Sequence, residues 1–236
     1  MDGRPMRFFH TGMQGTNMTF QDRETRTRWQ QETGEAFDGP HKGQRLEIHP
    51  FLITTWTEWR ARHPKTVVMT PVPGLSDMYD LMWRTIQART PDRAGPPSDR
   101  TLRGEYDSRL PAYEPIVGLE TGAAKRAYPL DVLRKERVVN DLPGGEPVLV
   151  VYVPDSDTVT VFARRAGTRT LTFSLRGADL VDAETGSRWN TYGECLEGDL
   201  KGTRLNALVG VRQFWWAWAA FYPEADIYAG KGSLQR

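Results

Sequence analysis

The chain of 236 residues has one cysteine, no long hydrophobic run and almost no net charge. The single Cys195 excludes an intrachain disulfide framework and a zinc site built from several cysteines. Thirty-one basic and thirty acidic residues nearly cancel, so the overall charge does not favour nucleic acid, and we expect no nucleic-acid partner. No run approaches the roughly 18 apolar residues of a membrane span. With 39% hydrophobic residues, the sequence predicts a globular protein with a substantial core.

Motifs that would localise the protein or define an enzyme site are also scarce. The polar start MDGRPMRFFHTG has no signal-peptide core, so we expect a cytoplasmic protein if the chain is complete and leave export open if a front segment is missing. LPGGEP at residues 142–147 precedes a predicted strand, where a phosphate-binding loop would precede a helix, and GxSxG is absent. No histidine pair has HxxxH or HxH spacing, so we predict neither a metal site nor a cofactor.

The sequence does contain a repeated motif. Residues 22–46, DRETRTRWQQETGEAFDGPHKGQRL, recur as DAETGSRWNTYGECLEGDLKGTRL at residues 182–205. One deleted residue changes the offset between identical residues from 160 to 159, and identities continue beyond the motif. We interpret them as an internal duplication. The identical pairs are Asp22/Asp182, Glu24/Glu184, Thr25/Thr185, Arg28/Arg188, Trp29/Trp189, Gly34/Gly193, Glu35/Glu194, Gly39/Gly198, Lys42/Lys201, Gly43/Gly202, Arg45/Arg204, Leu46/Leu205, Trp56/Trp215, Trp59/Trp218 and Pro64/Pro223.

The second copy predicts a β-meander followed by a helix. Residues 147–153 and 158–164 are β-branched runs around the turn PDSD, and residues 168–175 and 178–182 continue as strands. Residues 211–221, VRQFWWAWAAF, have aromatic residues at helical spacing. TTWTEWRARHP in the first copy keeps the two tryptophans. We therefore predict that both tryptophan pairs are core anchors that fasten a helix to each sheet.

These patterns predict a mainly β (α+β) fold of two homologous meander-plus-helix units packed as one body. The first unit, 1–72, is incomplete at its N-terminus; 73–115 is an insertion with a helix at Ser76–Ala88 and a proline-rich connector; 116–236 is the complete second unit. The first unit lacks counterparts of residues 116–162. Either the chain starts late, or Met6–Phe9 pairs with the second unit or with another subunit, which would make a homo-oligomer through this exposed edge.

The segments GTNMTFQDRETRTRWQQETGEAFDGPHKGQRLE, TTWTEWRARHP, AKRAYPLDVLRKERVVND and DAETGSRWN occur in the order found in a known family. The chain resembles the bacterial domain of unknown function thirty-one seventy-nine over most of residues 6–228. The resemblance implies no reaction. Many members carry a Cys-Pro-x-Cys hairpin, sometimes with selenocysteine, but Val153 and Ser156 stand at its two cysteine positions here, with Pro154 retained. The two thiols that a redox role would need at this hairpin are therefore absent from this chain.

A polar and aromatic cluster supplies the candidate ligand site. We predict a cleft between the units that takes a small molecule or peptide, with a tryptophan stacking on it and carboxylates or amides orienting it. The alternative is a scaffold in which Glu35 and Glu194 pair with arginines, because the acids and bases are duplicated together. The candidate ligand-binding residues are His10, Trp29, Gln31, Glu35, Trp189 and Glu194.

We therefore interpret the protein as a non-catalytic binding or interaction module. The alternative is an enzyme, either a degenerate thiol-redox relative or a carboxylate-dependent hydrolase using Glu35 and Glu194. A binding module predicts an aromatic-lined pocket without perturbed carboxylates, whereas an enzyme predicts a cleft with a buried acid or histidine whose pKa is displaced.

Overall fold

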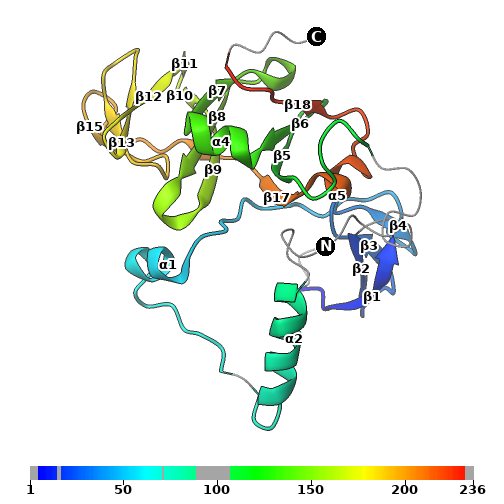
Figure 1. Ribbon diagram of the computed structural model, residues 1–236. Coiled ribbons are helices and arrows are strands. Elements are labelled where there is room, and N and C mark those ends of the chain that lie inside the picture. The colour runs from blue at the N-terminus through cyan, green and yellow to red at the C-terminus, as the bar shows by residue number, and fades with distance from the viewer. Residues whose placement is uncertain (1–4, 15–16, 71, 89–106, 232–236) are drawn as a thin grey trace.

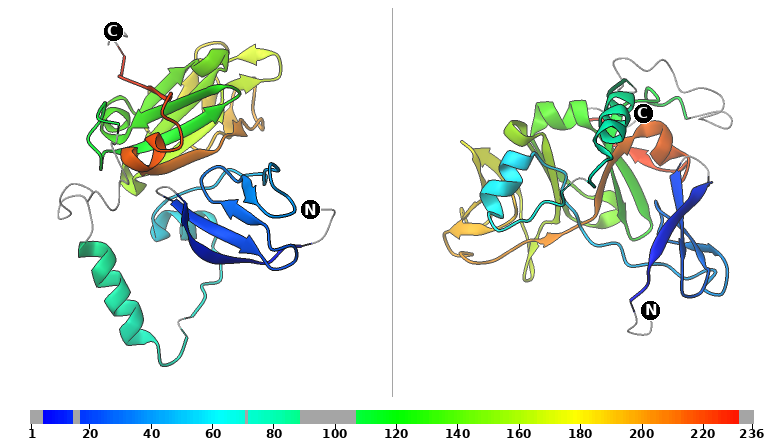
Figure 2. Two further views of the ribbon diagram at one scale, coloured as in Figure 1. Left: turned by 90° about the vertical axis from the view of Figure 1, so that its right-hand side faces the viewer. Right: turned by 90° about the horizontal axis from the view of Figure 1, so that it is seen from below.

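The computed structural model describes residues 5–14, 17–70, 72–88 and 107–231. It is mainly β, with 38% of the residues in strands and 17% in helices, which confirms the predicted class. In Figure 1 the strand-rich body of residues 107–231 lies above a separate N-terminal sheet, and the two turned views in Figure 2 keep these two bodies side by side.

The N-terminal sheet is a four-stranded antiparallel meander with strand order β1-β2-β3-β4. β1 lies at an edge of this sheet and pairs with β2. Pairing of Met6–Phe9 with the second unit or with another subunit, and a homo-oligomer through that edge, stay predictions. The strands are β1 (Phe8–Gln14), β2 (Asn17–Asp22), β3 (Arg28–Gln30) and β4 (Ala36–Asp38).

A second meander in residues 173–197 reproduces the first in detail. Its strand order is β12-β13-β14-β15. In each meander an indole nitrogen donates to a buried aspartate at 2.9 Å, from Trp29 to Asp22 and from Trp189 to Asp182. The strands are β12 (Phe173–Arg176), β13 (Asp179–Asp182), β14 (Arg188–Trp189) and β15 (Cys195–Glu197).

The contacts around these aspartates also match. Thr25 and Thr185 donate their backbone N–H and their hydroxyl to Asp22 and Asp182. A phenylalanine meets each tryptophan edge to face, at ring-centroid distances of 6.4 Å in the first meander and 5.7 Å in the second. The repeated DxETxxRW-like sequence therefore folds into the same turn twice, because its aspartate accepts every donor that the turn would otherwise leave buried without a partner.

Two further four-stranded sheets form the body of the second unit. Their orders are β16-β9-β8-β7 and β17-β5-β6-β18, with β18 parallel to β6. Two short strands, β10 (Arg165–Ala166) and β11 (Arg169–Thr170), form a small ribbon beside them. The main strands are β5 (Pro115–Thr121), β6 (Ala124–Pro129), β7 (Val138–Asp141), β8 (Val148–Val153), β9 (Thr158–Ala163), β16 (Asn206–Ala207), β17 (Gly210–Phe214) and β18 (Asp226–Ile227).

The core lies between and beside these sheets. Continuous apolar runs such as VLVVYV in β8 are buried on both faces, because one face packs on the second meander and the other on β5 and β6. α4 (Leu130–Glu136) covers the apolar residues between β8 and the β5–β6 pair through Leu130 and Leu133. The predicted PDSD turn between β8 and β9 contains a short 3-10 helix, Pro154–Ser156.

The predicted helix at residues 211–221 is only partly correct. Residues 210–214 instead form β17, which pairs with β5, and α5 begins later, at Trp215–Ala219. Trp215 and Trp218 are buried, as predicted for core anchors. Trp218 lies directly over Gly118 of β5: a Cβ at position 118 would come within 2.3 Å of the indole. The absence of a side chain at Gly118 therefore leaves the space that the Trp218 indole occupies.

The same prediction for the first unit is wrong. α1 (Trp56–Arg62) buries none of its residues, and Trp56 is 50% exposed. The described part of the first unit has no strand in the place that β5 takes beside α5, so the matching tryptophans have no sheet to pack against. α2 (Ser76–Ala88) has the predicted bounds and projects away from both bodies (Figure 1). The proline-rich connector falls mostly on residues 89–106, which lie outside the described residues.

Candidate functional site

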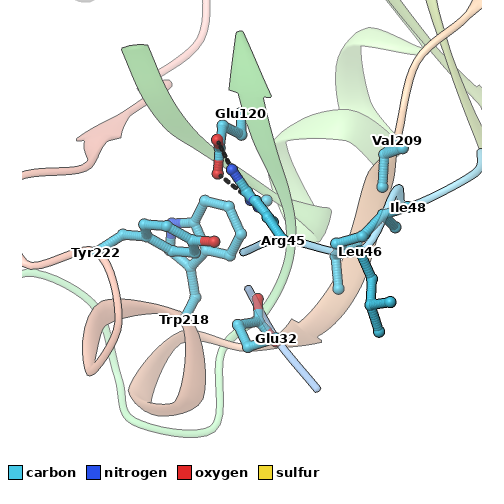
Figure 3. A pocket seen from close by; sticks show the side chains of 10 residues that line it. Glu32, Arg45, Leu46, Ile48, Glu120, Val209, Trp218 and Tyr222 are labelled. Carbon is cyan, nitrogen blue, oxygen red and sulfur yellow. Dashed lines mark hydrogen bonds and ion pairs between the residues drawn. The ribbon is translucent and has the colours of Figure 1, made fainter. Parts of the chain in front are cut away.

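A cavity of about 210 Å³ lies between the N-terminal sheet and the second unit (Figure 3). We call it the inter-unit cleft. One wall comes from the loops around β4 and from the chain that follows them, and the opposite wall comes from β5, β17 and α5. The lining residues are Glu32, Arg45, Leu46, Ile48, Gly118, Glu120, Val209, Val211, Trp218 and Tyr222.

An ion pair ties the two sides of the cleft together. The Arg45 guanidinium donates to both carboxylate oxygens of Glu120, at 2.9 and 3.2 Å, and Lys125 lies 3.0 Å from the same carboxylate. The hydrogen bond from Arg45, assisted by Lys125, lowers the pKa of Glu120 to about 2. Figure 3 shows Arg45 reaching across toward Glu120. Glu120 is therefore a permanently ionised carboxylate at neutral pH.

A second carboxyl group in the cleft has the opposite electrostatic environment. Glu32 is 7% exposed, and its two oxygens accept hydrogen bonds from Asn17 at 2.9 Å and from Gln213 at 2.7 Å. Burial raises the pKa of Glu32, and the amide hydrogen bonds only partly offset that effect. Because Gln213 belongs to β17, Glu32 joins the two units through a polar contact inside the cleft.

The aromatic side of the cleft comes from α5 and the residues after it. Trp218 and Tyr222 pack against each other with their ring centroids 4.2 Å apart and their planes tilted by 42°. Burial raises the pKa of the Tyr222 hydroxyl, and the nearby carboxylates Glu120 and Glu32 raise it further. Tyr222 therefore stays a neutral hydrogen-bonding group, and the cleft has aliphatic, aromatic and carboxyl surfaces within one small volume.

The six predicted ligand-binding residues do not gather in this cleft. Trp29 and Trp189 are 1% and 0% exposed and donate to their aspartates, so both indoles lie in the interior. His10, Gln31 and Glu35 lie on the surface of the N-terminal sheet. Glu194 lines a different, larger cavity. The ligand-binding role of these residues stays a prediction.

The predicted charge pairs differ between the two copies. Glu194 pairs with Arg204 at 2.8 Å, as the scaffold alternative expects. Glu35 and Arg45 form the equivalent backbone bridge, but the Arg45 side chain turns to Glu120 of the other unit instead. Arg204 thus pairs with an acid close to it in the chain, whereas Arg45 joins the chain after β4 to β5.

Sequence reasoning missed Glu32 and Glu120. The two copies differ in length by one residue between Trp29/Trp189 and Gly34/Gly193, and Glu32 lies in that interval. A length difference inside an otherwise matched motif is the signal that could have identified it. Glu120 has no such signal, because its partner Arg45 is 75 positions away.

Other candidate chemistry finds little support in the described residues. Burial raises the pKa of the Cys195 thiol, which donates to the backbone carbonyl of Glu197. Ser156, at one of the two motif positions, is buried and hydrogen-bonded to Thr158. Within the described ranges, no three metal-ligating side chains lie together. No helix in the same ranges is long and apolar enough to cross a membrane.

Comparison with known proteins gives one match. The family model described as protein of unknown function (DUF3179) matches residues 3–225, so the chain belongs to this family, as the sequence resemblance indicated. Neither the curated proteins nor the solved structures contain a match to the chain. The family thus defines a relationship and no activity, and function must be argued from the inter-unit cleft itself.

Proposed function

We propose that the protein is a non-catalytic binding module that takes a small polar molecule in the inter-unit cleft. The observation that carries this proposal is the Glu32 carboxyl group, which is buried at the cleft and held by one amide from each unit. A carboxylate can accept about four hydrogen bonds, and two of these positions are not used by Asn17 and Gln213. A ligand with hydroxyl or amine donors would satisfy them.

The size and walls of the cleft limit the ligand. Pockets for drug-sized molecules measure roughly 300–1,000 Å³, and the cleft of about 210 Å³ is smaller. Its aliphatic side, Leu46, Ile48 and Val211, favours a molecule with one apolar face. We therefore expect a compact molecule with donor groups on one side, such as a small sugar, polyol or amine.

The proposal also rests on the inference that the two meanders are copies of one ancestral unit. The matched hydrogen bonds around Asp22 and Asp182 support this inference. A binding cleft between two related units would then form where the copies diverge. Arg45 and the Glu32 loop are such places, because Arg204 has a different partner and the second copy is one residue shorter.

A carboxylate-dependent hydrolase is the second candidate, and it is favoured by a buried acid whose pKa is displaced, which we expect of an enzyme rather than of a binding module. The raised pKa of Glu32 and the low pKa of Glu120 place an acid and a carboxylate in the same cleft, a pattern found in acid–base catalysis. We rank it second because a general base works best with a pKa near the operating pH. Glu120 has a pKa of about 2 and both oxygens engaged by Arg45. For the thiol-redox alternative, Cys195 is the single thiol of the sequence, and it is buried.

The test is a thermal-shift screen of the full chain against defined sets of sugars, polyols and primary amines, followed by NMR titration of any hit. Glu32→Gln keeps the side-chain shape and removes the charge, and Glu35→Gln is the matched control on the exposed surface nearby. At 100 times its Kd a ligand stabilises the folded state by about 2.7 kcal/mol. We expect that shift in the wild type and in Glu35→Gln, and its loss in Glu32→Gln.

Three results would argue against the binding proposal. A hit that stabilises Glu32→Gln as well as the wild type places the ligand elsewhere. No hit in any of the three sets removes the proposed ligand class. Conversion of a hit by the wild type, with activity lost in Glu32→Gln and in Glu120→Gln, replaces the binding module with the hydrolase.

A further inference from the structure

A second and larger cavity, of about 500 Å³, lies beside the second unit. It is bounded on one side by residues 50–62, which leave the first unit and cross to the second, and on the other by β9 and β16. In Figure 1 α1 lies beside the hairpin of β8 and β9. The lining residues are Pro50, Phe51, Leu52, Trp59, Arg62, Val159, Thr160, Val161, Phe162, Tyr192, Glu194, Arg204, Ala207, Leu208 and Gly210.

The walls of this cavity are apolar over most of their area. Phe51 and Leu52 come from the crossing residues, and Val161, Phe162 and Leu208 come from the second unit. The crossing residues are held to the second unit by side-chain hydrogen bonds at two places, between Thr158 and Thr54 at 2.8 Å and from Tyr192 to Glu58 at 2.6 Å. The space between these attachments and the sheet is wide enough for a ligand of ordinary size.

One cation at the rim, Arg62, covers a tyrosine ring; the acid on the same helix, Glu58, lies one turn earlier and accepts the hydroxyl of that ring at 2.6 Å. The Arg62 guanidinium lies 3.4 Å above the Tyr192 ring, and none of the ion pairs among the described residues includes it. The other arginine of the lining, Arg204, is paired with Glu194. The lining therefore carries one net positive charge, on a guanidinium whose planar fork suits a carboxylate or phosphate.

We propose that this cavity binds an amphipathic small molecule, with its hydrocarbon part between Phe51 and Val161 and its anionic head, a carboxylate or phosphate, on Arg62. Apolar burial would supply most of the binding free energy, because the hydrocarbon part would leave water. The guanidinium would select the head group. Glu32, Arg45 and Glu120 do not line this cavity, so a test of this proposal is independent of the proposed ligand site in the inter-unit cleft.

Isothermal titration of the full chain tests the proposal, with octanoate and octyl phosphate below their micelle concentrations and octanol below its solubility limit. Arg62→Gln removes the charge, and Arg60→Gln is the matched control, an exposed arginine of α1 that does not line the cavity. Charge-assisted hydrogen bonds stabilise by about 1.5–3 kcal/mol. We expect at least about tenfold weaker binding of one or both anions in Arg62→Gln, no change in Arg60→Gln, and no effect of either variant on octanol. The ratio of octanoate to octyl phosphate affinity identifies the head group.

A second variant tests the location. Ala207 lines the cavity, and its side chain is exposed, so Ala207→Trp should fill the space and abolish binding of both anions while near-ultraviolet circular dichroism shows a native fold. If Ala207→Trp does not fold, the comparison of Arg62→Gln with Arg60→Gln tests the proposal by itself. Four results would each overturn the proposal. Two concern affinity: an equal loss of binding in Arg62→Gln and Arg60→Gln, or octanol binding as tight as that of octanoate. The other two are undiminished binding in folded Ala207→Trp and no binding of either anion. Glu32→Gln should bind octanoate as the wild type does.

Discussion

Replacing Asp182 with alanine should destabilise the protein more than any change to an exposed carboxylate. Asp182 is fully buried and accepts hydrogen bonds from the Trp189 indole at 2.9 Å, from the Thr185 backbone N–H at 2.7 Å and from the Thr185 hydroxyl at 2.8 Å. The Thr185 hydroxyl can turn to Ser187 and to water, since it already lies 2.7 Å from the Ser187 hydroxyl. The indole and the backbone N–H have no substitute acceptor.

The expected magnitude follows from those two donors. A buried donor left without a partner costs about 1–3 kcal/mol, so with two such donors Asp182→Ala should lower the free energy of unfolding by about 2–6 kcal/mol. That is a large part of a total that is typically about 5–15 kcal/mol. The matched control is Asp38→Ala. Asp38 is half exposed and pairs with Arg28 at 3.0 Å, and such surface pairs contribute up to about 1 kcal/mol.

The assay is urea unfolding followed by far-ultraviolet circular dichroism, with the indole N–H signals of ¹⁵N-labelled protein as a local probe. In the wild type the Trp189 indole hydrogen should exchange slowly, and in Asp182→Ala it should exchange rapidly. The reasoning is refuted if Asp182→Ala lies within about 0.5 kcal/mol of Asp38→Ala with an unchanged denaturant slope. Asp22→Ala should behave similarly at Trp29, because the first meander has the same hydrogen bonds.

Two further outcomes are expected. The pKa of Glu120 is about 2 in the folded protein and its ordinary value is 4.5, so its pairing stabilises the fold above about pH 4.5 and this stabilisation is lost as the pH falls towards 2. Because the group is partly open to water, the difference in unfolding free energy between the wild type and Glu120→Gln should be below about 1 kcal/mol at pH 7 and should vanish at pH 2. A difference that grows on acidification contradicts the pairing. Because burial raises the pKa of the Cys195 thiol, a disulfide reagent at pH 8 should label the folded chain at least about tenfold more slowly than the urea-unfolded chain, and equal rates would mean that the thiol is exposed.

Local patterns predicted those parts of the fold that depend on neighbouring residues. The strands β8 and β9 and the helix Ser76–Ala88 follow from periodicity and turn chemistry within about ten residues. The start of α5 could not be predicted from local sequence. Val211–Phe214 have helical spacing in the sequence, but they form a β-ladder with β5 instead. Tertiary pairing outweighed local preference there.

The candidate site was less predictable for the same reason. Glu32 meets Gln213 across 181 positions, and Arg45 meets Glu120 across 75, and nothing in either segment alone indicates its partner. Trp29 and Trp189 attracted a ligand-binding hypothesis as repeated aromatic residues near acids. The structure places both inside the meanders, where repetition reflects the hydrogen bond to Asp22 or Asp182.

By itself, the sequence determined the mainly β class, the family and the recurrence of residues 22–46 at residues 182–205, because each of these is set by residues close together in the chain. Only the tertiary structure decided what the equivalent residues of the two copies do. Trp215 is fully buried in α5 beside β5, while its counterpart Trp56 in α1 is half exposed beside no such strand. Arg204 pairs within its unit and Arg45 pairs across to Glu120. Identical side chains acquire different roles because burial and ion pairing are fixed by what packs opposite them.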